Sequence, residues 1–212
     1  MELASKFPDQ FYELLASTPG NQLKSGDKIY RGWRTDKLTD KIFFAFSHDP
    51  KWAIKLPTGT TTITCLRDPL ARATSYYNYI LSIRDEVRAN KNHPHVNMPD
   101  LAWAHDNWRK FICQVPHKHI SNQLWMFDKE FNPASAATQI EAINIVLTTE
   151  TLNRSINNIP GVKLIPRHFG ATKVKRSIPH EFSDELRNML RSEYEMINIL
   201  KDKGVICKNC WV

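Results

Sequence analysis

The sequence lacks the features that would place the chain in a membrane or a repeat class. No apolar run approaches the ~20 residues that a membrane-spanning helix needs. The N-terminal stretch MELASKFPDQFYELL lacks the basic region and the apolar core of a signal peptide. Internal repeats and low-complexity tracts are also missing, which excludes solenoid architectures. The 212 residues, 42% of them hydrophobic, instead suit one globular domain that spans residues 1–212.

Clustered metal ligands are also scarce. The chain has four cysteines: Cys65, Cys113, Cys207 and Cys210. The last two form a C-x-x-C pair, but a zinc site needs four ligands and no second pair stands at a suitable spacing. Two H-x-H pairs, His93/His95 and His117/His119, lack a nearby acidic or cysteine partner, so we expect them at the surface. The sequence therefore predicts no metal site.

Charge of one sign is in moderate excess. With 29 Lys and Arg residues against 22 Asp and Glu residues, the net charge is +7. Such a balance suits an anionic ligand, which could be a nucleotide, a nucleic acid or an acidic glycan. The basic residues are spread along the chain, and the tight cluster is Lys173, Lys175 and Arg176. A nucleic-acid-binding domain usually carries a denser basic stripe, so this function is the less favoured one.

Apolar and β-branched runs of strand length alternate with helical patterns, which predicts an α/β fold. The expected strands of a short, mostly parallel central sheet are Lys41–Ser47, Thr60–Leu66 and Ile143–Leu147. Helical patterns cover residues 7–16, 49–55, 69–91, 101–114, 120–128 and 134–141, and residues 17–40 predict a loop with a possible strand at Ile29–Trp33. Parallel strands end at one edge of a sheet, so His48 and Arg67 would be neighbours there.

The clearest helical pattern lies near the C-terminus. Ser183 is the expected N-cap, acidic residues follow it in the first turn, and Gly204 ends the helix. Its apolar face is formed by Leu186, Met189, Leu190, Ile197 and Leu200.

The stretch from Thr60 to Tyr79 carries the most information. It predicts a buried strand in which Cys65 is an inert core residue, followed by Arg67 and then a helix capped by Asp68 with Pro69 at its first position. Arg67 and Ser75 should then point towards one region, at the carboxyl end of the strand and beside the start of the helix. Open α/β sheets bind anionic ligands there, and a guanidinium with a hydroxyl suits a phosphate.

The segment RDPLARATSYY resembles the 3′-phosphate-binding segment of the Golgi-type carbohydrate sulfotransferases and their bacterial relatives. In that family an arginine and a serine at this spacing hold the 3′-phosphate of 3′-phosphoadenosine 5′-phosphosulfate (PAPS), the sulfonate donor. The resemblance gives these roles to Arg67 and Ser75. A capped helix that merely follows a strand is the simpler alternative.

Further segments resemble the same family in the same order, over about residues 40–202. They are FFAFSHDPKW, ISNQLWMF, INIVLTTETLNRSI and RHFGATKVKRSIP with the helix after it. The resemblance implies a P-loop-NTPase-like three-layer sandwich. It also implies that His48 is the catalytic base and that Lys173, Lys175 and Arg176 contact the nucleotide. Alternatively, His48 only stands next to the cap of a helix and has no chemical role. Lys173, Lys175 and Arg176 would then simply belong to a solvated basic loop.

One family feature is missing from the sequence. The family opens with a phosphate-binding loop that holds the sulfonate end of PAPS and supplies a lysine, and no such loop precedes the first expected helix. Pro57-Thr58-Gly59-Thr60-Thr61 lacks that lysine and leads into a strand, so we expect a turn. The first β-loop-α unit is then missing, or the sequence is N-terminally incomplete, and a sheet edge or a core face should be underfilled.

The sequence thus favours a PAPS-dependent sulfotransferase that acts on a hydroxyl, with a carbohydrate as the expected acceptor and no metal. The alternatives are an inactive nucleotide- or glycan-binding remnant of the fold and a basic nucleic-acid-binding domain. Aromatic and basic residues in the variable region, Trp103, His105, Trp108 and Arg109, suit a sugar or the core of a small helical subdomain. As given, the chain is expected to be cytoplasmic; an incomplete eukaryotic sequence would instead allow the Golgi lumen.

Overall fold

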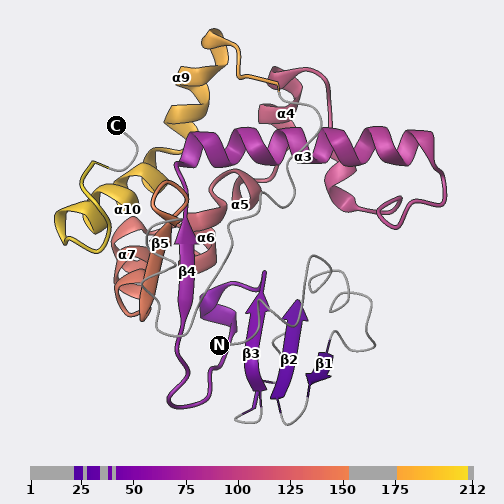
Figure 1. Cartoon of the computed structure of the whole chain (residues 1–212). Helices are drawn as coiled ribbons and strands as arrows, with labels where there is room; N and C mark the ends of the chain where they lie inside the picture. Colours follow the sequence, from indigo (N-terminus) through magenta and orange to yellow (C-terminus); the bar gives the residue numbers. More distant parts are fainter. Residues whose placement is uncertain (1–21, 26–27, 34–37, 40–41, 153–175, 210–212) are drawn as a thin grey trace.

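The strands that the structure describes fall into two sheets. The computed structural model describes residues 22–25, 28–33, 38–39, 42–152 and 176–209. One sheet contains β1 (Gln22–Ser25), β2 (Lys28–Trp33) and β3 (Ile42–Ser47), with β1 antiparallel and β3 parallel to β2. The other pairs β4 (Ile63–Leu66) with β5 (Ile145–Thr148) in parallel (Figure 1). The protein is therefore mixed α/β.

The predicted single central sheet is wrong, although each strand expected in it exists. β3 pairs with β2 rather than with β4, and β4 pairs with β5. An apolar run shows that a segment forms a strand, but its partner depends on contacts between distant segments, which a run does not reveal. The partner of β3 is β2, at the place where the sequence indicates only a possible strand. β1 lies within the predicted loop.

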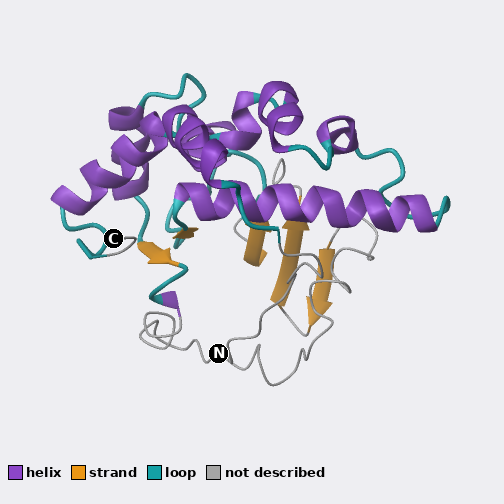
Figure 2. Ribbon diagram, turned by 90° about the horizontal axis from the view of Figure 1, so that it is seen from above, coloured by secondary structure: helices purple, strands orange, loops and turns teal. Residues whose placement is uncertain are grey.

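In the centre of the chain the helices predicted over residues 69–91 and 134–141 are confirmed, whereas the one predicted over residues 101–114 is interrupted at residues 104–107. After the short 3₁₀ helix η2 (Lys51–Ala53), the long helix α3 (Pro69–Ala89) begins directly after β4. The other elements are η3 (Pro99–Trp103), α4 (Trp108–Gln114), α5 (His117–Ile120), α6 (Asn122–Phe127), α7 (Pro133–Glu141), α9 (His180–Met189) and α10 (Arg191–Asp202). Figure 2 shows most helices to one side of α3 and the β1–β3 sheet to the other. The helix predicted over residues 7–16 lies outside the described residues.

The last predicted helix is divided in two. α9 begins at His180, three residues before the expected cap Ser183, and Leu190 separates it from α10. Pro179 stands at the N-cap position, where its extended backbone starts the helix without a side-chain cap. The predicted end is confirmed, because Gly204 has a φ of 71°, a left-handed conformation that glycine adopts without strain.

Two apolar clusters form the core. The first joins α3 to α4, α5 and α9 and contains Tyr77, Phe111, Ile120 and Leu186, all of which have no exposed surface. The second joins β4 to α6, α7 and α10 and contains Leu66, Leu124, Ile140 and Met196. α3 therefore lies beside one core and, through its first turn, at the margin of the other.

Side chains on the two faces of β4 differ in their exposure. Side chains alternate along a strand, and Leu66 is 1% exposed, whereas Ile63 is 49% exposed. Cys65, on the same face as Ile63, is also exposed, so the prediction of a core cysteine is wrong. Among the described residues, no strand pairs with the other edge of β4. The underfilled edge or face expected for a fold without its first β-loop-α unit stays a prediction.

Candidate functional site

The candidate site is built around the point where β4 ends and α3 begins. Arg67 follows Leu66, the last residue of β4, and its peptide is held by the amide of Gln123 on α6. The Arg67 N–H donates to Gln123 Oε1 at 2.7 Å, and Gln123 Nε2 donates to the Arg67 carbonyl at 2.9 Å. Because both backbone groups are satisfied by one side chain, the position of Arg67 depends directly on Gln123.

Gln123 is itself held by a buried carboxylate. Gln123 Nε2 donates at 2.8 Å to Oε1 of Glu193, a residue of α10 that has no exposed surface. Arg72 Nε on α3 lies 3.4 Å from the same oxygen. Burial raises the pKa of Glu193, while the positive charge of Arg72 opposes that shift. These contacts of Gln123, Glu193 and Arg72 join α6, α10 and α3. The second guanidinium nitrogen of Arg72, Nη2, has no hydrogen-bond partner within the described part of the chain.

The first turn of α3 is already capped. The Asp68 carboxylate accepts from the Ala71 N–H at 2.7 Å, as the sequence predicts. The Tyr194 hydroxyl of α10 accepts from the Leu70 N–H at 3.3 Å and donates to Asp68 Oδ2 at 3.2 Å. An anion at this helix start would therefore find these N–H groups occupied. It would have to be bound by side chains.

Arg67 and Ser75 are the side chains predicted for that purpose. Ser75 lies in the second turn of α3, and both residues are half-buried. Among the described residues, neither the Arg67 guanidinium nor the Ser75 hydroxyl makes a hydrogen bond or an ion pair. The same strand edge carries Thr149, whose N–H donates to the Leu66 carbonyl at 2.9 Å. Figure 1 shows α3 starting at the tip of β4.

The third basic residue of the predicted cluster, Arg176, is anchored to α3. The amide of Asn78, one helical turn after Ser75, exchanges two 3.0 Å hydrogen bonds with the Arg176 backbone. The Arg176 guanidinium pairs at 2.5 Å with Asp106, which also pairs at 2.8 Å with Arg84. Hydrogen bonds from Arg84, and then from Arg176, lower the pKa of Asp106 to about 2. Lys173 and Lys175 lie outside the described residues.

His48 follows β3 and has an exposed side chain. Desolvation lowers its pKa, and the negative charge of Asp49 opposes this. A neutral imidazole at pH 7 can accept a proton, as a base must. The predicted reason for its closeness to Arg67, a shared sheet, does not hold because β3 and β4 belong to different sheets. Its role as the base stays a prediction.

The structure also describes the predicted turn at Pro57–Thr61 and Trp108 of the variable region. Pro57–Thr61 contains a turn, as predicted: Thr60 donates its N–H and its hydroxyl to the Pro57 carbonyl, and Gly59 has a φ of 79°. In the variable region, Trp108 is 6% exposed and its ring centroid lies 3.9 Å from that of Tyr77. Trp108 is therefore a core residue, which matches the helical-subdomain alternative for that region.

Trp103 and His119 both contact Tyr76 on α3. Trp103 packs against the first core cluster and donates to the Tyr76 hydroxyl at 3.0 Å. His119 is partly buried and stacks on the Tyr76 ring, with the centroids 5.8 Å apart, so the surface position predicted for it holds only in part. His105, Arg109 and Cys113 stay at or near the surface. Within the described ranges, no group of three or more His, Cys, Asp or Glu residues could hold a metal ion.

Gln123, Glu193 and Tyr194 support the site, but sequence reasoning did not select them. Gln123 lies in the ISNQLWMF segment, where only the resemblance pointed to it. Glu193 had a signal of its own: it stands three residues after Leu190 and four before Ile197, on the apolar face of the helix. An acid on such a face requires a buried partner.

Comparisons with known proteins add no assignment. No protein-family model matches the chain, and neither a curated protein nor a solved structure matches it. None of the described helices combines the length and the apolar character of a membrane span.

Proposed function

We propose that the protein binds the 3′-phosphate of PAPS through Arg67 and Ser75, as part of a sulfotransferase that transfers a sulfonate group to a hydroxyl of a carbohydrate. The observation that carries the proposal is the guanidinium of Arg67, which makes no hydrogen bond or ion pair within the described part of the chain, while Gln123 holds the Arg67 N–H and carbonyl at 2.7 and 2.9 Å. A fork of donors on a rigid base suits a dianionic phosphate, and preorganisation lowers the entropic cost of binding it.

The transfer itself needs a base for the acceptor hydroxyl and positive charge at the leaving phosphate. His48 is the proposed base, and its lowered pKa keeps the imidazole neutral at pH 7. Lys173, Lys175 and Arg176 are proposed to contact the nucleotide. This proposal is supported by the Arg176 backbone, which lies beside Asn78, one turn from Ser75.

Adenosine 3′,5′-bisphosphate, the product that PAPS leaves, is the direct probe of the site. Arg67→Ala should weaken its binding by roughly 10- to 100-fold in isothermal titration calorimetry, because a charged hydrogen-bond donor contributes about 1.5–3 kcal/mol. Arg88→Ala is the matched control, since Arg88 lies near the other end of α3 and its side chain is 66% exposed. Equal affinities of the wild type and Arg67→Ala would remove the nucleotide proposal.

The base is tested separately from binding. In a preparation that transfers sulfonate, His48→Ala should lower turnover by roughly 10²–10⁴-fold with little change in nucleotide affinity. His95→Ala, another exposed histidine, is the control. A normal turnover rate of His48→Ala would show that His48 is not the base.

A binding-only function is the second candidate. It is favoured by the Pro57–Thr60 turn, because this glycine-containing segment leads into β4, whereas a phosphate-binding loop leads into a helix. Under this function the protein would bind adenosine 3′,5′-bisphosphate through Arg67 and Ser75 but would not transfer sulfonate.

A further inference from the structure

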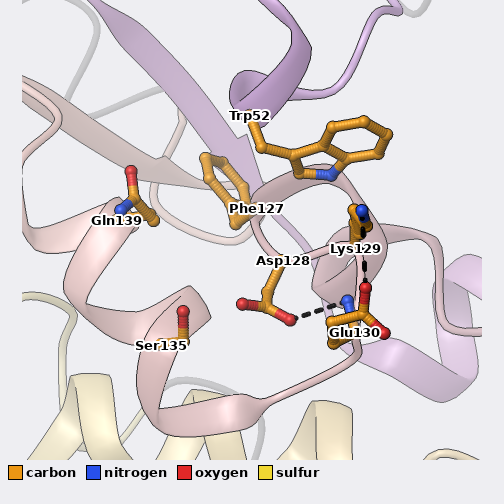
Figure 3. A pocket seen from close by; sticks show the side chains of 7 residues that line it. All are labelled: Trp52, Phe127, Asp128, Lys129, Glu130, Ser135 and Gln139. Atoms are coloured by element: carbon orange, nitrogen blue, oxygen red, sulfur yellow. Dashed lines mark hydrogen bonds and ion pairs between the residues drawn. The ribbon is translucent and has the colours of Figure 1, made fainter.

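A pocket of about 400 Å³ lies away from Arg67, between η2, the end of α6 and the start of α7. Figure 3 shows the indole of Trp52 over one side of it and Asp128 reaching into its centre. Its other lining residues are Phe127, Lys129, Glu130, Ser135 and Gln139. Its volume falls within the range of about 300–1,000 Å³ that small-molecule sites occupy.

The indole of Trp52 is exposed and yet held in place. It is 44% exposed, which is high for a tryptophan, and its Nε1–H donates to the Trp125 carbonyl at 2.8 Å. Its ring meets that of Trp125 edge-on, at 5.5 Å and 85°. Phe127 beneath it is 8% exposed and belongs to the second core cluster. The pocket thus offers one fixed aromatic surface.

The opposite side of the pocket carries neutral and acidic polar groups. Ser135 and Gln139 are exposed on α7 and stand four residues apart, so they share a face of that helix. Asp128 is fixed by the N–H groups of Glu130 and Asn132, which donate to its Oδ1 at 2.9 and 3.0 Å. Glu130 forms an exposed ion pair with Lys129 at 3.6 Å. The lining has one net negative charge, opposite to the sign of the whole chain.

We infer that this pocket binds the ring of a neutral sugar. A pyranose has a face of C–H groups that can lie on an indole, and hydroxyls around its rim that can donate to carboxylates and accept from an amide or a hydroxyl. An anionic ligand is disfavoured by Asp128 and Glu130. A quaternary ammonium ion would need several aromatic faces around it, but among the described lining residues Trp52 is the one with an exposed ring.

The role of the pocket rests on the proposed function, because the sugar bound here would be an unsulfated unit of the acceptor glycan. The binding itself does not depend on the nucleotide site. A failure of the sugar inference can therefore be distinguished from a failure of the nucleotide proposal. Sugar binding is measured without nucleotide, and adenosine 3′,5′-bisphosphate binding is measured without sugar.

The test is a titration of the ¹⁵N-labelled protein with methyl glucoside, methyl galactoside and N-acetylglucosamine, followed at the indole N–H resonances. We expect at least one of these sugars to shift the Trp52 indole resonance saturably. Gln139→Leu should weaken that binding by about fivefold, the value of one hydrogen bond. Tyr79→Ala, which removes another exposed aromatic ring, should change nothing.

Trp52→Ala should abolish the binding and leave the affinity for adenosine 3′,5′-bisphosphate unchanged. If Trp52→Ala does not fold, Gln139→Leu decides, because Gln139 is exposed and its replacement leaves the core intact. The absence of saturable binding by all three sugars would overturn the inference, as would sugar binding that is unaffected in Gln139→Leu. Tighter binding of tetramethylammonium than of any sugar would also overturn it.

Discussion

At the scale of single residues, some side chains of the candidate site could be predicted from the sequence and others could not. Arg67, Asp68 and Pro69 could be predicted because strand ends and helix caps have local signatures, and the cap is confirmed. Gln123 and Glu193 could not be placed in the same way. Each acts on a residue more than 50 positions away, and no local pattern encodes such a contact.

Replacing Gln123 by leucine tests whether the Gln123 amide stabilises the Arg67 backbone. The variant leaves the Arg67 N–H and carbonyl unsatisfied and removes a donor to the buried Glu193, so we expect a loss of about 1–3 kcal/mol in the free energy of unfolding. Chemical denaturation measures this value. Gln139→Leu, at an exposed position of α7, should change it little. Equal stabilities of the two variants would contradict the supporting role of Gln123.

The low pKa of Asp106 leads to a prediction on acid stability. Its pKa is about 2 in the folded protein, below the usual 3.8, so its ion pairs stabilise the protein fully above pH 4 and progressively less as the pH falls towards 2. Asp106→Asn should therefore reduce the loss of stability between pH 4 and pH 2, measured by urea unfolding at each pH. The effect will be small because Asp106 is more than half exposed. Asp184→Asn, on the exposed side of α9, should behave as the wild type.

At the scale of elements, periodicity predicted the helices better than the sheet. The helix predicted over residues 69–91 is confirmed as α3, and its Ala73, Tyr77, Ile80 and Leu81 are buried. The strands were found, but their division into two sheets was missed because pairing partners are set by tertiary contacts. The break at Leu190 was missed for a similar reason. The apolar residues of α9 pack on the first core cluster and those of α10 pack on the second, although they form one continuous pattern in the sequence.

The contact between α10 and the start of α3 can be tested with one hydroxyl. Tyr194→Phe removes the acceptor for the Leu70 N–H and the donor to Asp68, so we expect a loss of about 1 kcal/mol. For a protein of 150–250 residues this lowers Tm by about 2–4 °C. Tyr79→Phe is the matched control, because Tyr79 is 39% exposed. A Tm for Tyr194→Phe that equals the control would show that α10 does not hold the start of α3.

At the scale of the whole molecule, nucleotide binding and sulfonate transfer are two separate predictions. The described residues contain a candidate 3′-phosphate site, whereas Pro57–Thr60, the one segment similar to a phosphate-binding loop, is a turn before β4. Losing a single donor to the charge that develops in a transition state costs about 10²–10³-fold in rate. We therefore expect residues 1–212 to bind the nucleotide but to show little turnover in a radiolabelled sulfate-transfer assay with desulfated glycans. Robust turnover would mean that another segment performs the work of the loop.

The central claim is that Arg67 and Ser75 recognise a 3′-phosphate. It is tested most directly by calorimetric titration of the wild-type protein with adenosine 3′,5′-bisphosphate and with adenosine 5′-monophosphate, which differ only in that phosphate. We predict that the bisphosphate binds roughly 10- to 100-fold more tightly, and that Arg67→Ala removes most of the difference. Equal affinities of the two nucleotides for the wild type would contradict the account.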